Sequence, residues 1–234
     1  MRNSRFFFKQ FAVEQSGAAM KIGTDGVLLG AWVVASGAER VLDIGTGTGV
    51  IALMVAQRCA AKSIVGIDIE QGAVECAAEN FKASPWSDRL SAEHSSVQEY
   101  CGAEFDLVVT NPPYFTDSLL CPEANRTTAR HTISLSFEEL DSAVCRLLDS
   151  RVGRFALILP TEQMERYLAL TRLSLVRRCD IRSRANSEVI RTMAELSVVP
   201  AESVEQQSLV IYQDQGREYT AQYRELTKDF YLKF

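Results

Sequence analysis

The 234-residue sequence has no long apolar run, no cysteine pair at metal-binding spacing and no excess of positive charge. Its six cysteines are scattered without any Cys-x-x-Cys pair, so neither a zinc site nor a secreted disulfide framework is indicated, and no metal is expected. The formal net charge of -5 argues against a globally basic, nonspecific nucleic-acid binder, because phosphate binding draws on lysine and arginine.

The first nine residues combine a basic flank with three phenylalanines, but this apolar run is too short for a signal peptide or a membrane span. Unpaired thiols fit a reducing compartment, so a cytoplasmic protein is expected. The length fits one ordinary α/β domain, and a monomer is favoured.

Strand-like and helix-like patterns alternate along the chain. Expected strands are Val41–Ile44, Ser63–Asp68, Leu90–His94, Phe105–Thr110, Gly153–Leu159, Leu175–Arg182 and Arg191–Val199, with Leu209–Tyr212 as a further edge strand or hairpin. Expected helices are Val27–Trp32 capped by Thr24 or Asp25, Val50–Ala56, Gln71–Lys82, Ser136–Leu148 with a capping box, Glu162–Leu173 and Tyr219–Leu232. This order predicts a Rossmann-like α/β fold: a seven-stranded, mostly parallel sheet with a C-terminal antiparallel strand pair and helices on both faces.

Three features each close one expected strand at its carboxyl end. They are the glycine-rich turn Gly45–Gly49, the carboxylate Asp68 and the amide Asn111. Ligands of parallel sheets bind at this edge, so the three features are expected to converge on one site.

The glycine turn has the spacing Gly-x-Gly-x-Gly. Gly45 and Gly47 allow a ligand to approach the backbone, and the helix after Gly49 offers free N–H groups. The alternative is a tight turn that needs glycine only for its conformation. Asp68 is placed to accept hydrogen bonds from ribose hydroxyls, with Glu70 as a competitor and a solvated or helix-capping carboxylate as the alternative.

The tetrapeptide Asn111-Pro112-Pro113-Tyr114 indicates a binding site for an amino group. The Asn111 side-chain oxygen and the Pro112 carbonyl are two neutral acceptors that suit the two N–H donors of an exocyclic amine. Tyr114 offers a flat surface on which a planar base stacks. The alternative is a proline-rich turn whose tyrosine caps the core.

These motifs resemble those of the class I S-adenosylmethionine-dependent methyltransferases, in the branch that methylates amino nitrogens. The order of Lys9-Gln10-Phe11, Met20–Trp32, Asn111–Tyr114 and Asp229–Leu232 is similar to that in the bacterial valine-tRNA adenine-N6 methyltransferases. The resemblance covers nearly the whole chain. It implies a cap segment with a helix over 1–36 and a methyltransferase domain over 37–234.

The resemblance also implies roles for individual residues. The implied cofactor-binding residues are Thr24, Asp25, Asp43, Gly45, Thr46, Gly47, Gly49, Asp68, Ser96, Val97 and Asn111. Ser96 stands where the family usually has an aspartate that meets the adenine of the cofactor, so a looser adenine pocket is expected, served by backbone groups. The implied catalytic residues are Asn111, Pro112 and Tyr114, and the substrate contacts are Tyr114, Arg126, Arg130 and His131.

The implied partner is tRNA, bound at an adenosine beside the anticodon that is already unpaired or is flipped out of its stack. Local cationic patches are expected to form the RNA-facing surface. They are Arg2, Arg5 and Lys9 at the start of the chain, Arg126 and Arg130 after Tyr114, and Arg177, Arg178, Arg182, Arg184 and Arg191 along the last strands. For each of them a solvated position or pairing with an acidic residue is the alternative. Other functions stay open: glutamine-N5 methylation of a protein such as a release factor, adenine-N6 methylation of rRNA or DNA, and noncatalytic RNA binding or cofactor sensing.

Overall fold

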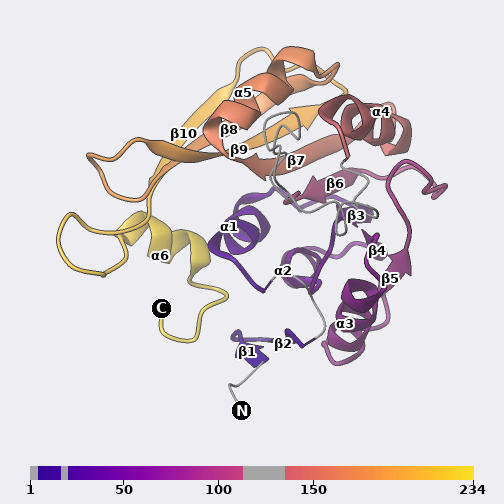
Figure 1. Ribbon diagram of the computed structural model, residues 1–234, viewed down its shortest axis with the longest axis horizontal. Helices are drawn as coiled ribbons and strands as arrows, with labels where there is room; N and C mark the ends of the chain where they lie inside the picture. The colour runs from indigo at the N-terminus through magenta and orange to yellow at the C-terminus, as the bar shows by residue number, and fades with distance from the viewer. Residues whose placement is uncertain (1–4, 17–20, 113–134) are drawn as a thin grey trace, which may run out of the picture.

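The computed structural model describes residues 5–16, 21–112 and 135–234 (Figure 1). The strands are β1 (Arg5–Phe7), β2 (Ala12–Glu14), β3 (Arg40–Ile44), β4 (Ser63–Asp68), β5 (Leu90–His94), β6 (Leu107–Thr110), β7 (Arg154–Leu159), β8 (Ser174–Arg182), β9 (Val189–Ser197) and β10 (Glu205–Val210). The helices are α1 (Thr24–Trp32), α2 (Val50–Arg58), α3 (Gln71–Lys82), α4 (Phe137–Leu147), α5 (Thr161–Leu170) and α6 (Ala221–Thr227). No helix of these described ranges is long and apolar enough to cross a membrane.

The central sheet has the strand order β10-β8-β9-β7-β6-β3-β4-β5. Strand β9 runs antiparallel to both of its neighbours, β7 and β8, and every other pair in this sheet is parallel. The predicted mostly parallel sheet with an antiparallel pair near the C-terminus is therefore confirmed.

The predicted number of strands is wrong by one, because the described part of the chain contributes eight strands to the sheet. The eighth is the edge strand β10, which begins at Glu205 rather than at Leu209 and pairs parallel to β8. Its first residues are polar and mostly exposed, as edge strands often are, so no apolar alternation marks its start. A long-range contact holds it in place: the Trp32 side chain donates a 2.6 Å hydrogen bond from Nε1 to Gln207 Oε1.

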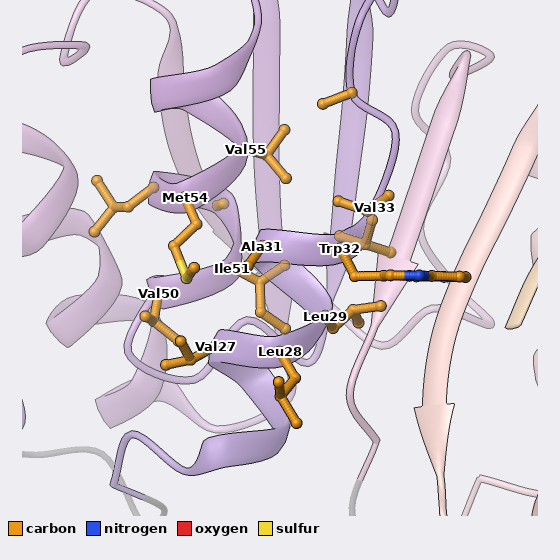
Figure 2. Close-up of a cluster of buried hydrophobic side chains, with 14 of the residues drawn as sticks. Val27, Leu28, Leu29, Ala31, Trp32, Val33, Val50, Ile51, Met54 and Val55 are labelled. Carbon is orange, nitrogen blue, oxygen red and sulfur yellow. The ribbon is translucent and has the colours of Figure 1, made fainter. Parts of the chain in front are cut away.

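Helices cover both faces of the sheet, as predicted (Figure 1). Side chains of α1, α2, α3 and α6 form one buried apolar cluster, and those of α4 and α5 form a second one. Figure 2 shows the first cluster where α1 crosses α2: Val27, Leu28 and Ala31 of α1 lie beside Ile51 and Met54 of α2.

Local sequence patterns predicted some helix ends more accurately than others. The predicted capping box exists, because Ser136 Oγ accepts from Glu139 N while Glu139 accepts from the Ser136 N–H. The predicted N-cap of α1, Thr24 or Asp25, is wrong by one or two positions, since the N-cap is Gly23 and Thr24 is the first residue of the helix. Helix α6 is shorter than predicted and ends at Thr227.

The residues that follow α6 contact the N-terminal segment of the chain. Strands β1 and β2 form a small antiparallel sheet, which the sequence did not predict. Next to it Phe8 forms a β-bridge with Tyr231, and Lys9 Nζ donates to the carbonyl oxygens of Lys228 (2.6 Å) and Phe234 (2.8 Å). These backbone groups therefore pair with the N-terminal segment instead of extending the helix.

Candidate active site

The three predicted rim features lie side by side at the carboxyl edge of the sheet. Ile44 of β3 is in register with Thr110 of β6 and with Ile67 of β4. The next residue on each strand is thus Gly45, Asn111 or Asp68, and the convergence predicted from the sequence is confirmed. The end of β6 is tied to β3 by a 2.8 Å hydrogen bond from Thr110 Oγ1 to the carbonyl oxygen of Ile44.

The glycines of the turn serve different purposes. Gly45, Gly47 and Gly49 have φ values of +69°, +57° and +79°, a region that favours glycine. A Cβ added at Gly49 would lie 2.4 Å from a ring carbon of Phe81, so this glycine is also required by packing. A Cβ added at Gly45 would meet no atom of the described residues within 4 Å, so Gly45 faces open space of the kind a ligand needs.

Asp43 is a fully buried carboxylate beneath this turn. Its Oδ2 accepts hydrogen bonds from Thr46 Oγ1 (2.8 Å) and from the backbone N–H of Ala52 (3.3 Å). Its Oδ1 has no hydrogen-bond partner among the described residues. Burial raises the pKa of Asp43 to about 7, although the hydrogen bonds from Thr46 and Ala52 oppose this. An unsatisfied buried oxygen beside an open glycine turn fits a bound polar ligand.

Asp68 is joined directly to the glycine turn. Its Oδ2 accepts from the backbone N–H of Gly47 at 2.9 Å, and its Oδ1 accepts from the N–H of Glu70 at 3.0 Å. The next residue, Ile69, is 49% exposed, which is unusual for a large apolar side chain at the end of a core strand. Ile69 was not predicted as a site residue, although its position directly after a strand-ending carboxylate indicates that it lies at the edge of the site.

Ser96 and Val97 lie on the same edge, just beyond β5. The last residue of β5, His94, is in register with Asp68, and the N–H of Ser95 donates to the carbonyl oxygen of Asp68 at 3.1 Å. Ser96 Oγ accepts from the N–H of Glu99 and donates to its carboxylate, so it acts within its own turn. Val97 is buried.

Of the predicted catalytic and substrate-contacting residues, the structure describes Asn111 and Pro112. Asn111 is half-buried and Pro112 is buried, immediately after β6. A Cβ added at Gly26 in the first turn of α1 would lie 3.8 Å from Asn111 Nδ2, so this turn borders the amide. Tyr114, Arg126, Arg130 and His131 lie outside the described residues.

Thr24 and Asp25 are the other predicted cofactor contacts, and they open α1. Thr24 is exposed, and the carboxylate of Asp25 pairs with Arg191, whose Nε lies 2.8 Å from Asp25 Oδ2. This ion pair was not predicted, since Arg191 was assigned to the RNA surface.

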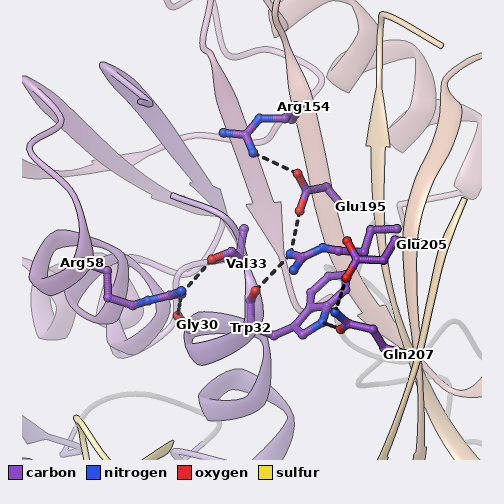
Figure 3. A network of polar contacts seen from close by, with 9 residues as sticks. Gly30, Trp32, Val33, Arg58, Arg154, Glu195, Glu205 and Gln207 are labelled. Carbon is purple, nitrogen blue, oxygen red and sulfur yellow. Dashed lines mark hydrogen bonds and ion pairs between the residues drawn. The ribbon is translucent and has the colours of Figure 1, made fainter. Parts of the chain in front are cut away.

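The other arginines predicted to face RNA from the last strands also have partners within the chain. Arg177 donates to Trp32 O and pairs with Glu195, its side chain is 12% exposed, and its guanidinium lies 3.8 Å from the centre of the Trp32 ring (Figure 3). Arg178 pairs with Glu165 and Asp180, and Arg182 and Arg184 donate to backbone carbonyls. For the nearly buried Arg177 the RNA-facing prediction is wrong, because its charge is neutralised in the interior.

Comparison with solved structures and family models defines the class. A protein from Agrobacterium tumefaciens described as a predicted O-methyltransferase superposes with a TM-score of 0.67 at 18% identity, covering 88% of this chain and 96% of that one. The N-methyltransferase NodS of Bradyrhizobium japonicum WM9, solved with S-adenosyl-L-homocysteine, gives a TM-score of 0.52 at 16% identity, covering 73% and 83%. The family model "Methyltransferase small domain" matches residues 12–134. The chain therefore contains the methyltransferase small domain and has the fold of the class I methyltransferases.

Relatives along the full chain define the family. A protein of Phocaeicola vulgatus is 43% identical over 99% of both chains, one of Parabacteroides distasonis is 41% identical over 100% of both, and one of Edwardsiella ictaluri is 42% identical over 98% of this chain and 94% of its own. All three are named tRNA1(Val) (adenine(37)-N6)-methyltransferase. The chain belongs to this family, as its motifs predicted.

Proposed function

We propose that the protein transfers a methyl group from S-adenosylmethionine to the exocyclic N6 amine of adenosine 37 in a valine tRNA. The names of the full-length relatives support this substrate. The observation that carries the proposal is the position of Asn111 and Pro112 at the end of β6, one strand away from the open glycine turn of β3.

The residues that would hold the cofactor fit it chemically. The free Oδ1 of buried Asp43 suits a cationic amine, directly or through water, and the open turn at Gly45 and Gly47 leaves room for the methionine end. Asp68, which adjoins the glycine turn, would accept hydrogen bonds from the ribose hydroxyls, and the exposed Ile69 with the backbone beyond Ser96 would border the adenine. When bound, the cofactor supplies a methyl group activated by its positively charged sulfur.

The chain's own contribution to the reaction is positioning. Asn111 Oδ1 and the Pro112 carbonyl oxygen would each accept a hydrogen bond from one N–H of the adenine amine. This favours a pyramidal nitrogen whose lone pair is no longer conjugated with the ring. The amine nitrogen would form its bond to the methyl carbon as the bond from that carbon to sulfur breaks, which leaves S-adenosyl-L-homocysteine. The surplus N–H proton would be released to solvent with the products. Because no residue has to retain that proton, geometry and exclusion of water matter more than a titrating base. Tyr114 would stack on the base, and Arg126, Arg130 and His131 would contact the anticodon loop. Residues 1–36 would act as the cap of this site, and tRNA as substrate agrees with a cytoplasmic enzyme.

The test is to incubate the purified protein with labelled S-adenosylmethionine and total tRNA from a strain that lacks the enzyme. The tRNA is then fractionated and digested, and the labelled nucleoside is identified. We expect label in N6-methyladenosine of valine tRNA. Label in cytosine, in rRNA or DNA offered in parallel, or in glutamine of an added release factor would replace the proposal by the corresponding alternative.

A further inference from the structure

Arg191 lies at the same edge of the sheet as the candidate active site. It is near the start of β9, and the following residue, Thr192, is in register with Leu159, the last residue of β7. Because β9 is antiparallel to β7, the start of β9 meets the carboxyl ends of the parallel strands. A cationic side chain in β9 is thereby brought to the rim that carries Asn111.

One partner of Arg191 is Asp25, in the first turn of α1. Its Nε donates to Asp25 Oδ2 at 2.8 Å, and about a quarter of each side chain is exposed (26% for Arg191 and 22% for Asp25). A carboxylate in the first turn also interacts favourably with the positive end of the helix dipole. Asp25 thus joins the first turn of α1 to β9.

The same turn of α1 borders the amide of Asn111. Gly26 is buried, and a Cβ added there would lie 3.6 Å from Val50 at the start of α2 and 3.8 Å from Asn111 Nδ2. The backbone of this turn therefore lies next to Asn111, with space for little more than a methyl group between them. Arg191 is ion-paired with Asp25, and Asp25 is followed directly by Gly26, the neighbour of Asn111.

The body of α1 is held independently of Arg191. At its carboxyl end Arg58 donates to the carbonyl oxygens of Gly30 and Val33, and Arg177 donates to that of Trp32 (Figure 3). Between these ends the helix is buried. A partly exposed ion pair adds little to folding stability, so removing Arg191 leaves the helix in place and frees mainly its first turn.

We propose that Arg191 is a positioning residue for methyl transfer, which acts by holding Asp25 and the first turn of α1 against Asn111. This inference rests on the proposed function for its kinetic test. A shift of the amide by a fraction of an ångström would misalign the amine, and such misplacement is costly for a transfer that depends on geometry.

The experiment compares Arg191→Gln, Asp25→Asn and the double variant, with Arg172→Gln as the control. Arg172 is also an ion-paired arginine, but its partner is Asp141 of α4, which packs in the other apolar cluster from α1. We expect Arg191→Gln to lower kcat by about tenfold while KM for S-adenosylmethionine changes by less than about threefold. Arg191→Lys, which retains a cationic donor, should keep more activity, and Arg172→Gln should keep all of it.

The decisive observation is whether the losses of kcat in the two single variants combine in the double variant. If Arg191 acts through Asp25, the double variant should be no slower than the slower single variant. An unchanged kcat in Arg191→Gln, an equal loss in Arg172→Gln, or losses that multiply in the double variant would overturn the inference. The melting temperature of Arg191→Gln should fall by less than about 4 °C.

A second readout separates this inference from the proposed function. If the wild-type enzyme methylates no tRNA, the proposed function fails, and hydrogen exchange still tests the contact. Arg191→Gln should speed exchange in a peptide over 21–32 and leave peptides of β7 unchanged. Unchanged exchange over 21–32 would overturn the role of Arg191 whatever the substrate.

Discussion

Asp43 shows how a single buried residue can be costly for the fold and useful for the site. Burial raises its pKa to about 7, and one of its oxygens has no hydrogen-bond partner among the described residues. An unfolded chain ionises this group at a lower pH than the folded one. The cofactor-free protein therefore loses stability as pH rises from about 4 to 7, and regains it when a cationic ligand satisfies the oxygen.

The substitution Asp43→Asn tests this assignment. It should raise the melting temperature of the cofactor-free protein at about pH 8, and this gain should shrink toward pH 5, where the folded wild-type protein already holds the proton. The same change should weaken binding of S-adenosylmethionine, measured by calorimetry. Wild-type affinity should decrease as pH falls through about 7, and a pH-independent affinity would contradict the assignment.

The glycine turn offers a matched pair of variants. Gly45→Ala and Gly49→Ala both place a Cβ at positive φ, which costs about 1–2 kcal/mol. Only Gly49→Ala adds a clash with Phe81, so it should lower the free energy of unfolding more, as measured by denaturant titration. Gly45→Ala should weaken cofactor binding more. The reverse order in either measurement would show that the ligand does not lie over Gly45.

At the scale of helices and strands, the sequence predicted the features that depend on interactions between residues close together in the chain. Helix α3 begins and ends where its pattern indicated, and the capping box at Ser136 set the start of α4. Strand β10 and the end of α6 depend on contacts between distant segments, such as Trp32 with Gln207 and Phe8 with Tyr231. No local pattern of residues contains that information.

Glu195 of β9 forms ion pairs with arginines of both neighbouring strands. It was not predicted from the sequence to have this role, although a carboxylate within a buried strand indicates a cationic partner. Its two oxygens bind Arg154 (2.9 Å) and Arg177 (2.8 Å), and its side chain is 4% exposed (Figure 3). Glu195→Gln leaves two cations without their shared anion, so the free energy of unfolding should fall by about 3 kcal/mol in denaturant titrations.

The control for Glu195 is the exposed pair of Glu39 and Lys62, whose side chains are 63% and 73% exposed. Glu39→Gln should change the free energy of unfolding by less than about 0.5 kcal/mol. Equal effects of the two variants would mean that β9 is not held to its neighbours by Glu195.

For the whole molecule, the site was predictable because parallel topology brings strand ends together. Once the order of strands and helices was inferred, Gly45, Asp68 and Asn111 had to share an edge, and the register confirms it. The role of the arginines was not predictable in the same way. Whether an arginine faces a phosphate or an internal carboxylate depends on tertiary neighbours, as Arg177 and Arg191 show.

Salt dependence tests how an acidic protein binds an acidic partner. The net charge of -5 requires that tRNA binding rest on local cationic groups, among which we include Arg126 and Arg130. Raising the salt concentration from about 50 to 200 mM should weaken tRNA binding by at least about tenfold, while cofactor affinity changes little. A flat response in a filter-binding titration would contradict a phosphate-contacting surface.

Our central claim is that Asn111 binds the reacting amine, and that its implied contact with the cofactor adds little to cofactor affinity. The most direct measurement compares wild type and Asn111→Ala in two assays: calorimetric binding of S-adenosylmethionine, and single-turnover methyl transfer to valine tRNA. We predict that the affinity of Asn111→Ala stays within about threefold of wild type while the transfer rate falls by at least about a hundredfold. Equal losses of binding and transfer, or a variant that still transfers methyl groups at the wild-type rate, would contradict the claim.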